Sequence, residues 1–177
     1  MSQDVPQFTG ITGYQEPGGR FAFRYPWDWH AEGLGQGRDG VILTPDRTDP
    51  DTYVAAWISP LPAAVAAEDL PPLRDGFDEG LATLPDLHVL DSRDEALGNL
   101  VKLERTVTFS DGGATRKRLL WAIYAGSMQL LFVYQGGSPQ AYAYWLPMGN
   151  YCCATLRLAD EIWYASDPGL RPARPAA

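Results

Sequence analysis

The sequence predicts an α+β fold in which an antiparallel β-sheet is sandwiched by helices, in an α/β/α arrangement. One observation is the order of the elements, because the spacing of apolar residues indicates strands, one helix, four strands and a last helix. A second is the run from Leu97 to Tyr134, where two tight turns separate three strands, as in an antiparallel meander. A third is the chain length of 177 residues, which suits one domain with a full core.

An aromatic strand near the N-terminus is the most regular of these elements. Three aromatic residues alternate with alanine and arginine over Phe21–Tyr25, which is the period of a strand with one buried face. Pro26 lacks the N–H group that a ladder needs, so it ends the strand. We expect Trp27 and Trp29, which follow at once, to close one end of the core.

Shorter strands are expected on both sides of this segment. Residues 1–18 are polar and leave room for one short strand before a glycine-rich turn. Residues 31–40 are again rich in glycine and predict a flexible loop. Apolar residues over 41–44 and 53–59 then indicate two further strands, the first of which is ended by Pro45.

One helix is expected over Glu68–Leu84, because its apolar residues follow the i, i+4, i+7, i+8 spacing of a single buried face. That face consists of Leu73, Phe77, Gly80, Leu81 and Leu84. Pro85 and Asp86 then end the helix.

Four strands follow this helix, over residues 87–92, 97–109, 115–124 and 128–134. The turn signal Ser110–Gly113 joins the second and third of them into a hairpin. One side of the second strand consists of Val101, Leu103, Arg105, Val107 and Phe109. On the third strand, we expect the same apolar side of the sheet to carry Leu119, Trp121 and Ile123.

The last helix begins with Ser138 as its N-cap and Pro139 at its first helical position. Pro147 is expected to kink or interrupt it. Its apolar face is predicted to contain Tyr144, Trp145, Met148 and Cys152. The domain is expected to span residues 1–164, and the composition of residues 165–177 is that of a flexible tail.

The charge balance excludes two classes of partner. A net charge of -8 argues against sequence-independent binding to nucleic acid or to an anionic membrane surface, because a basic field drives both. No run of 18 apolar residues is present, so membrane insertion is not expected. The N-terminus lacks the basic and apolar regions of a signal peptide, and we therefore expect a cytoplasmic protein.

No combination of residues predicts catalysis, a cofactor or a metal site. Cys152 and Cys153 are adjacent and cannot join distant parts of the chain, so we expect two reduced, partly buried thiols. His30 and His88 match no metal-ligand spacing, and we expect both at the surface. The basic triplet Arg116–Arg118 is expected to be a solvated strand end. The chain is therefore predicted not to be an enzyme, and only a cavity holding a polar residue with a strongly shifted pKa would favour one.

Three features are shared with a known superfamily. They are the opening G-x-F-x-F-x-Y-P-x-x-W over residues 19–29, the short strand over 41–44 with Pro45, and the order of a helix, a meander and a last helix. On these features, over roughly residues 14–158, the chain resembles the PsbP-like superfamily, which includes the extrinsic photosystem II subunit, a Ran-binding nuclear import factor and bacterial adaptors and lipoproteins. The resemblance implies a central antiparallel sheet between helices and a non-enzymatic role in binding or stabilising partner proteins.

We therefore expect an accessory protein of the adaptor or chaperone type, which binds another protein in a secretion system or another multiprotein assembly. Its contact surface is predicted either on a face of the sheet or at the apolar residues Ile162, Trp163 and Tyr164. The alternative is a carrier of a small apolar ligand, with a pocket between the sheet and a helix. Six aromatic residues are expected in the core, or else in an apolar groove: Trp57, Trp121, Phe132, Tyr134, Tyr144 and Trp145.

Overall fold

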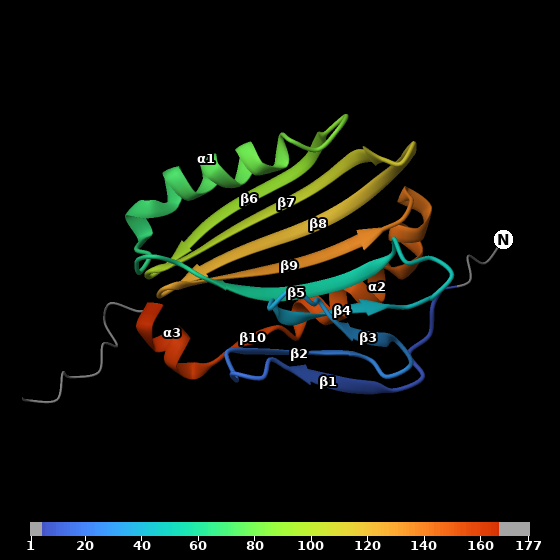
Figure 1. The fold of residues 1–177 in the computed structure, drawn as a ribbon, viewed down its shortest axis with the longest axis horizontal. Coiled ribbons are helices and arrows are strands. Elements are labelled where there is room, and N and C mark those ends of the chain that lie inside the picture. The colour runs from blue at the N-terminus through green and yellow to red at the C-terminus, as the bar shows by residue number, and fades with distance from the viewer. Residues whose placement is uncertain (1–4, 167–177) are drawn as a thin grey trace, which may run out of the picture.

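The structure is a computed structural model that describes residues 5–166, without the side chains of residues 164–166. Its centre is a seven-stranded sheet in which every neighbouring pair of strands is antiparallel (Figure 1). From one edge to the other, the strands are β3 (His30–Gly33), β4 (Asp39–Thr44), β5 (Tyr53–Pro60), β9 (Met128–Gly136), β8 (Ala114–Ala125), β7 (Leu100–Asp111) and β6 (His88–Leu97).

Helices cover both faces of this large sheet. On the face that we call the inner face lies α2 (Pro139–Ala154), together with a small sheet of β1 (Ile11–Gln15), β2 (Phe21–Pro26) and β10 (Arg157–Leu158). On the opposite, outer face lies α1 (Leu70–Leu81), which a 3-10 turn (Ala67–Asp69) precedes. Figure 1 shows α1 and the small sheet on opposite sides of the large sheet. The predicted α+β fold, with an antiparallel sheet between helices, is therefore confirmed.

The chain continues after β10 into a short helix, α3 (Asp160–Ser166). The predicted tail over residues 165–177 falls, apart from its first two residues, outside the described part of the chain. Within residues 5–166, no helix has the length and apolar character that crossing a membrane requires.

The main core fills the space between the inner face, α2 and β2. Phe21 and Phe23 of β2 are both buried, which confirms the predicted alternation. The ring of Phe23 meets that of Phe132 edge to face, with 5.6 Å between the centroids. Tyr134 is completely buried, and its hydroxyl donates a 2.6 Å hydrogen bond to the carbonyl of Tyr142 in α2. This bond joins α2 to the centre of the sheet.

Only one of the two tryptophans that follow β2 closes the core. The Trp29 side chain is 6% exposed and packs edge to face on Trp145, with ring centroids 5.9 Å apart. Trp27 is 59% exposed, and its Nε1 donates to Thr9 Oγ1 at 3.0 Å. The prediction was therefore wrong for Trp27. The chain turns after Pro26, whose carbonyl accepts a bond from the Trp29 amide, and only one indole is directed inward.

The register of the hairpin of β7 and β8 shows that the predicted side of β8 was wrong. Its turn residues Gly112 and Gly113 both have positive φ, as a two-residue hairpin turn requires. Asp111 therefore pairs with Ala114, so odd-numbered residues of β7 lie opposite even-numbered residues of β8. The residues Leu119, Trp121 and Ile123 consequently share the inner face with Thr106, Glu104 and Lys102, and not the outer face with Val101, Leu103 and Val107.

Two further elements differ from the predictions. Part of the predicted loop over 31–40 forms β3 and the start of β4, because backbone pairing from His30 to Gly33 needs no apolar side chains. The helix α2 passes through Pro147 without interruption, and Ser138 is its N-cap, as predicted. On its predicted apolar face Met148 and Cys152 are buried, whereas Tyr144 is 43% exposed.

Candidate functional site

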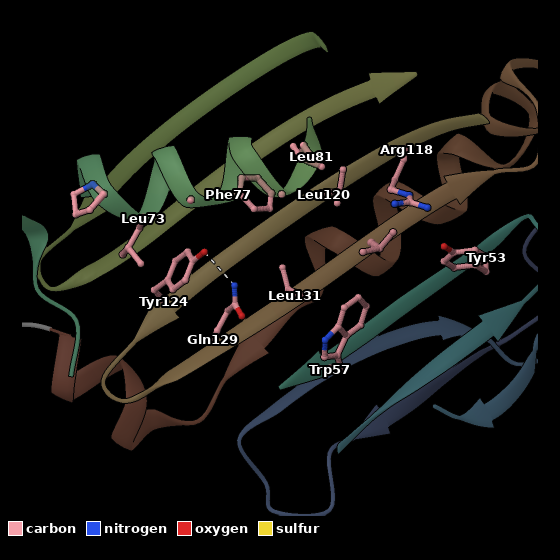
Figure 2. Close-up of a pocket in the computed structure, with 14 residues that line it drawn as sticks. Tyr53, Trp57, Leu73, Phe77, Leu81, Arg118, Leu120, Tyr124, Gln129 and Leu131 are labelled. Carbon is pink, nitrogen blue, oxygen red and sulfur yellow. Dashed lines mark hydrogen bonds between the residues drawn. The ribbon is translucent and has the colours of Figure 1, made fainter. Parts of the chain in front are cut away.

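A groove lies between α1 and the outer face of the large sheet, and we call it the α1 groove. Its volume is about 480 Å³. Residues of α1 form its wall, and residues of β5, β8 and β9 form its floor. Figure 2 shows Leu73, Phe77 and Leu81 on the helix, and Tyr124, Leu131 and Trp57 on the strands beside it.

The wall of the α1 groove combines packing residues with glycines. Leu73, Phe77 and Leu81 hold α1 on the sheet, since each packs in one or both of the outer-face clusters. Gly76 and Gly80 alternate with them along the helix and also line the groove. A Cβ atom added to either glycine would meet nothing within 4 Å. The absence of two side chains therefore leaves open space along this wall, although each glycine costs the helix about 1 kcal/mol relative to alanine.

The floor is a continuous apolar surface. Trp57 of β5 lies beside Leu131 of β9, and Val133 and Leu120 are the next pair along β9 and β8. Trp57, Leu131 and Tyr53 are only half-buried. Six side chains on the inner face of the same strands are buried: Val54, Ala56, Ile58, Leu130, Phe132 and Tyr134. The floor is thus the place where the packing of the outer face is incomplete.

The two ends of the α1 groove carry polar groups, as Figure 2 shows. At one end, Gln129 Nε2 donates a 3.1 Å hydrogen bond to the hydroxyl of Tyr124, whose pKa is raised by burial. At the other end, Arg118 donates to the side-chain amide oxygen of Gln135, and Tyr53 is also within hydrogen-bond distance of that oxygen. Arg118 and Tyr124 are six residues apart on β8, which corresponds to about 20 Å of strand.

Arg105 fastens α1 to the sheet next to the groove. Its side chain is 3% exposed and donates from Nε and Nη2 to the two carboxylate oxygens of Asp78 in α1, at 2.8 and 3.1 Å. Its Nη1 donates to Asp94 of β6 at 2.6 Å. One buried guanidinium therefore joins the helix, β7 and the edge strand β6.

A second cavity, of about 510 Å³, lies on the small sheet. Its lining includes Arg24, Thr155 and Arg157, and both arginines are exposed. The strand β10 pairs with only two residues of β2. The backbone amide of Arg24, further along β2, therefore donates its hydrogen bond to the Thr155 hydroxyl, at 2.8 Å. The cavity reflects this short pairing, and no charged side chain among its described lining residues is buried.

The groups that could carry out chemistry are scattered or inert. Cys152 and Cys153 are free thiols, as predicted, but they are buried and not partly buried. Burial raises the pKa of Cys152 to about 12 and that of Cys153 further. His30 is half-buried in β3, and His88 begins β6 at the surface. Across residues 5–166, no group of three or more His, Cys, Asp or Glu side chains could hold a metal ion.

The predicted contact residues lie away from the α1 groove. Ile162 is half-buried and packs against the main core, whereas Trp163 is 44% exposed. The side chain of Tyr164 lies outside the described residues. This surface therefore stays a prediction. A pocket between the sheet and a helix is among the alternatives that the sequence predicts, but its place beside α1 is not. Gly76 and Gly80, four residues apart on one helical face, are a signal that could have indicated that place.

No protein-family model and no curated protein sequence matches the chain. Solved structures do. Cyanobacterial PsbP (CyanoP) from Synechocystis is 12% identical with a TM-score of 0.58, over 90% of this chain and 98% of that chain. LpqN of Mycobacterium tuberculosis, described as involved in cell envelope biogenesis, is 14% identical with a TM-score of 0.60, over 85% and 91%. A protein of Bacteroides thetaiotaomicron is 17% identical with a TM-score of 0.53, over 83% and 48%. The chain therefore has a PsbP-like fold.

Proposed function

We propose that the protein is a non-enzymatic accessory protein of the adaptor or chaperone type, which holds an apolar segment of a partner protein in the α1 groove. The observation that carries this proposal is the strip of half-buried aromatic and aliphatic side chains beside α1. Trp57 and Leu131 lie on that strip, next to a helix wall that two glycines leave open. An apolar strip that the packing of the domain leaves partly accessible to solvent is typical of a binding surface.

The shape of the groove favours a protein segment. Its wall residues Pro72, Gly76 and Gly80 are exposed, so the groove is open to solvent along α1. Its length of about 20 Å equals that of a helix of about 13 residues. Amphipathic helices bind to apolar grooves of this kind through side chains that recur on one face.

Photo-crosslinking in the native host tests the proposal. A benzoylphenylalanine at Gly76 is expected to crosslink to one contiguous apolar segment of a partner, and mass spectrometry identifies that segment. Gly33 in β3 is the matched control position, because it too is exposed and a Cβ there meets nothing within 4 Å. A synthetic peptide of the captured segment is expected to bind the purified protein.

A variant that fills the groove tests the proposal in a second way. Gly80→Trp places an indole where the added Cβ has open space, so the fold is expected to stay intact while the groove is blocked. Peptide affinity is expected to fall at least about tenfold, whereas Gly33→Trp is expected to leave it unchanged. Crosslinks that Gly80→Trp does not remove would contradict the proposed site.

A second candidate function is the carriage of a small apolar ligand. The volume of about 480 Å³ favours it, since ligand pockets generally measure about 300–1,000 Å³. Native mass spectrometry of the protein from its host distinguishes the two. A bound small molecule that Gly80→Trp displaces would favour the carrier, and a protein purified without one, together with peptide binding, would favour the adaptor.

A further inference from the structure

We infer that the apolar segment held in the α1 groove carries a carboxylate that pairs with Arg118. The inference rests on the proposed function, because it specifies the chemistry of the partner at the same site. Arg118 is the one charged residue among the described residues that line the groove. A segment made only of apolar side chains would leave this charge partly desolvated without a counter-ion.

The hydrogen bonds of Arg118 leave its charge uncompensated. Its Nε and Nη2 both donate to the side-chain oxygen of Gln135, at 2.8 and 2.5 Å, and its guanidinium carbon lies 4.5 Å from the ring centroid of Phe109. Gln135 is a neutral amide. Among residues 5–166, no carboxylate lies within 4.0 Å of Arg118, and no acceptor is bonded to its Nη1.

The neighbouring arginines of the same sheet are paired. Arg116 lies 2.7 Å from Asp51 and 3.6 Å from Asp111, and Arg105 has two aspartates. The chain has a net charge of -8 and thus an excess of acidic residues. None of those in the part of the chain that the structure describes forms an ion pair with Arg118. The arginine that faces the groove therefore differs from its neighbours in a way that suits an external anion.

Gln135 holds this arginine in position. Its side chain is 3% exposed, and its Nε2 donates to the carbonyl of Asp51 at 2.9 Å. Its oxygen is thereby directed toward Arg118 and Tyr53. A fixed neutral acceptor orients the guanidinium without neutralising it, which leaves N–H donors for a carboxylate of the bound segment.

The placement of this charge also sets the direction of the bound segment. Figure 2 shows Arg118 at one end of the groove, and Tyr124 with Gln129 at the other. The second end is neutral, because Gln129 is an amide and the Tyr124 phenol is uncharged at neutral pH. An acidic side chain on one end of the segment is therefore expected to lie at the Arg118 end, with the apolar side chains on Trp57 and Leu131.

Selection from a display library of random peptides of about 14 residues tests the inference, because such a peptide spans the groove as a helix. Peptides that bind the wild-type protein are expected to share apolar residues at helical spacing and an Asp or Glu at one fixed offset from them. Arg118→Glu is expected to select Lys or Arg at that offset, and Arg118→Lys is expected to keep the acidic preference. Arg157→Glu, the same charge change at an exposed arginine on the small sheet, is the matched control and is expected to leave the selection unchanged.

The affinity of one selected peptide gives the quantitative result. Replacing the acidic residue of the peptide by Gln is expected to weaken its binding to the wild-type protein about tenfold. The same replacement is expected to leave its binding to the Arg118→Met variant unchanged. If the Arg118→Glu variant does not fold, the comparison between the wild-type protein and Arg118→Met is the test of the charge.

The outcomes separate this inference from the proposed function. Peptides that Gly80→Trp displaces but that show no acidic preference would overturn the inference and leave the groove as the site. Selected peptides that bind the Gly80→Trp variant as tightly as the wild-type protein, or a selection without any binder, would refute both the inference and the proposed function.

Discussion

Arg105 is buried beneath α1, and Arg105→Met is expected to lower the free energy of unfolding by about 3 kcal/mol. Methionine keeps an unbranched apolar side chain of similar length next to Phe77, whose ring centroid lies 5.8 Å from the guanidinium carbon. The change therefore removes the charge and its hydrogen bonds more than it removes packing. Asp78 and Asp94 then lose their shared donor.

The magnitude follows from the burial of the three side chains. Removing one partner of a fully buried ion pair costs about 3–5 kcal/mol, because the other charge stays desolvated. Arg105 is 3% exposed, but Asp78 is 45% and Asp94 is 24% exposed, so water can solvate both carboxylates after the change. The expected loss therefore lies at the lower end of that range. Asp78→Asn alone is expected to cost about 1 kcal/mol, since Asp94 still compensates the guanidinium.

Urea unfolding followed by circular dichroism measures these losses, with a double-mutant cycle for the pair. If Arg105 and Asp78 act together, the double variant is expected to lose about 1 kcal/mol less than the sum of the single variants. Lys102→Met, on the inner face of the same strand, is the control, because Lys102 makes one ion pair, with Glu104, and its side chain is 20% exposed, whereas that of Arg105 is 3% exposed. A loss below about 1 kcal/mol for Arg105→Met, or strict additivity with Asp78→Asn, would refute the view that this arginine fastens α1.

Three other properties follow from the main core and the small sheet. Tyr134→Phe removes the 2.6 Å hydrogen bond to α2 without changing the packing, so urea unfolding is expected to show a loss of about 1 kcal/mol; no loss would mean that the bond is energetically silent. Hydrogen bonds from Arg20 lower the pKa of Glu16 from 4.5 to about 2, so the stability this carboxylate contributes is complete above pH 4.5 and is lost as the pH falls toward 2. Glu16→Gln is therefore expected to lose less stability than the wild type over that pH interval, and parallel pH profiles would argue against the pairing. Because burial raises the pKa of Cys152 to about 12 and also raises that of Cys153, neither thiol is expected to react with Ellman's reagent in the folded protein at pH 8, and both should react in urea; a fast-reacting thiol before unfolding would contradict this.

The parts of the fold that depend on local sequence were predictable. The meander from β7 to β9 was predicted because glycine-rich turns and the period of two lie within a few residues of each other. The start of α2 was predicted from Ser138 and Pro139 for the same reason. The residues of β8 that share a side of the sheet with Val101, Leu103 and Val107 were predicted wrongly, because they depend on whether the turn holds two residues or three, and Ser110–Gly113 allowed both.

The sequence predicts a pocket between the sheet and a helix only as an alternative. It does not give the size of the α1 groove, because that size depends on how far α1 lies from β5 and β9. The residues next to Trp57 in the sequence are those expected around a core residue. Trp57 is half-buried only because of the position of α1, a helix distant from it in sequence. Arg118 was interpreted as a solvated strand end, since nothing local indicated that Gln135, on the neighbouring strand, would hold its guanidinium. Contacts between residues far apart in sequence decided both cases.

The separation of the two faces of β9 has a practical consequence for protein engineering. Leu131 and Val133 face the α1 groove, whereas Leu130, Phe132 and Tyr134 belong to the main core on the other face. Groove residues can therefore be randomised without touching the side chains that hold the small sheet and α2 in place. A library with variation at Trp57 and Leu131 would keep the framework constant, as loop libraries do in antibody domains. The fold thus offers a starting scaffold for designed recognition of helical peptides.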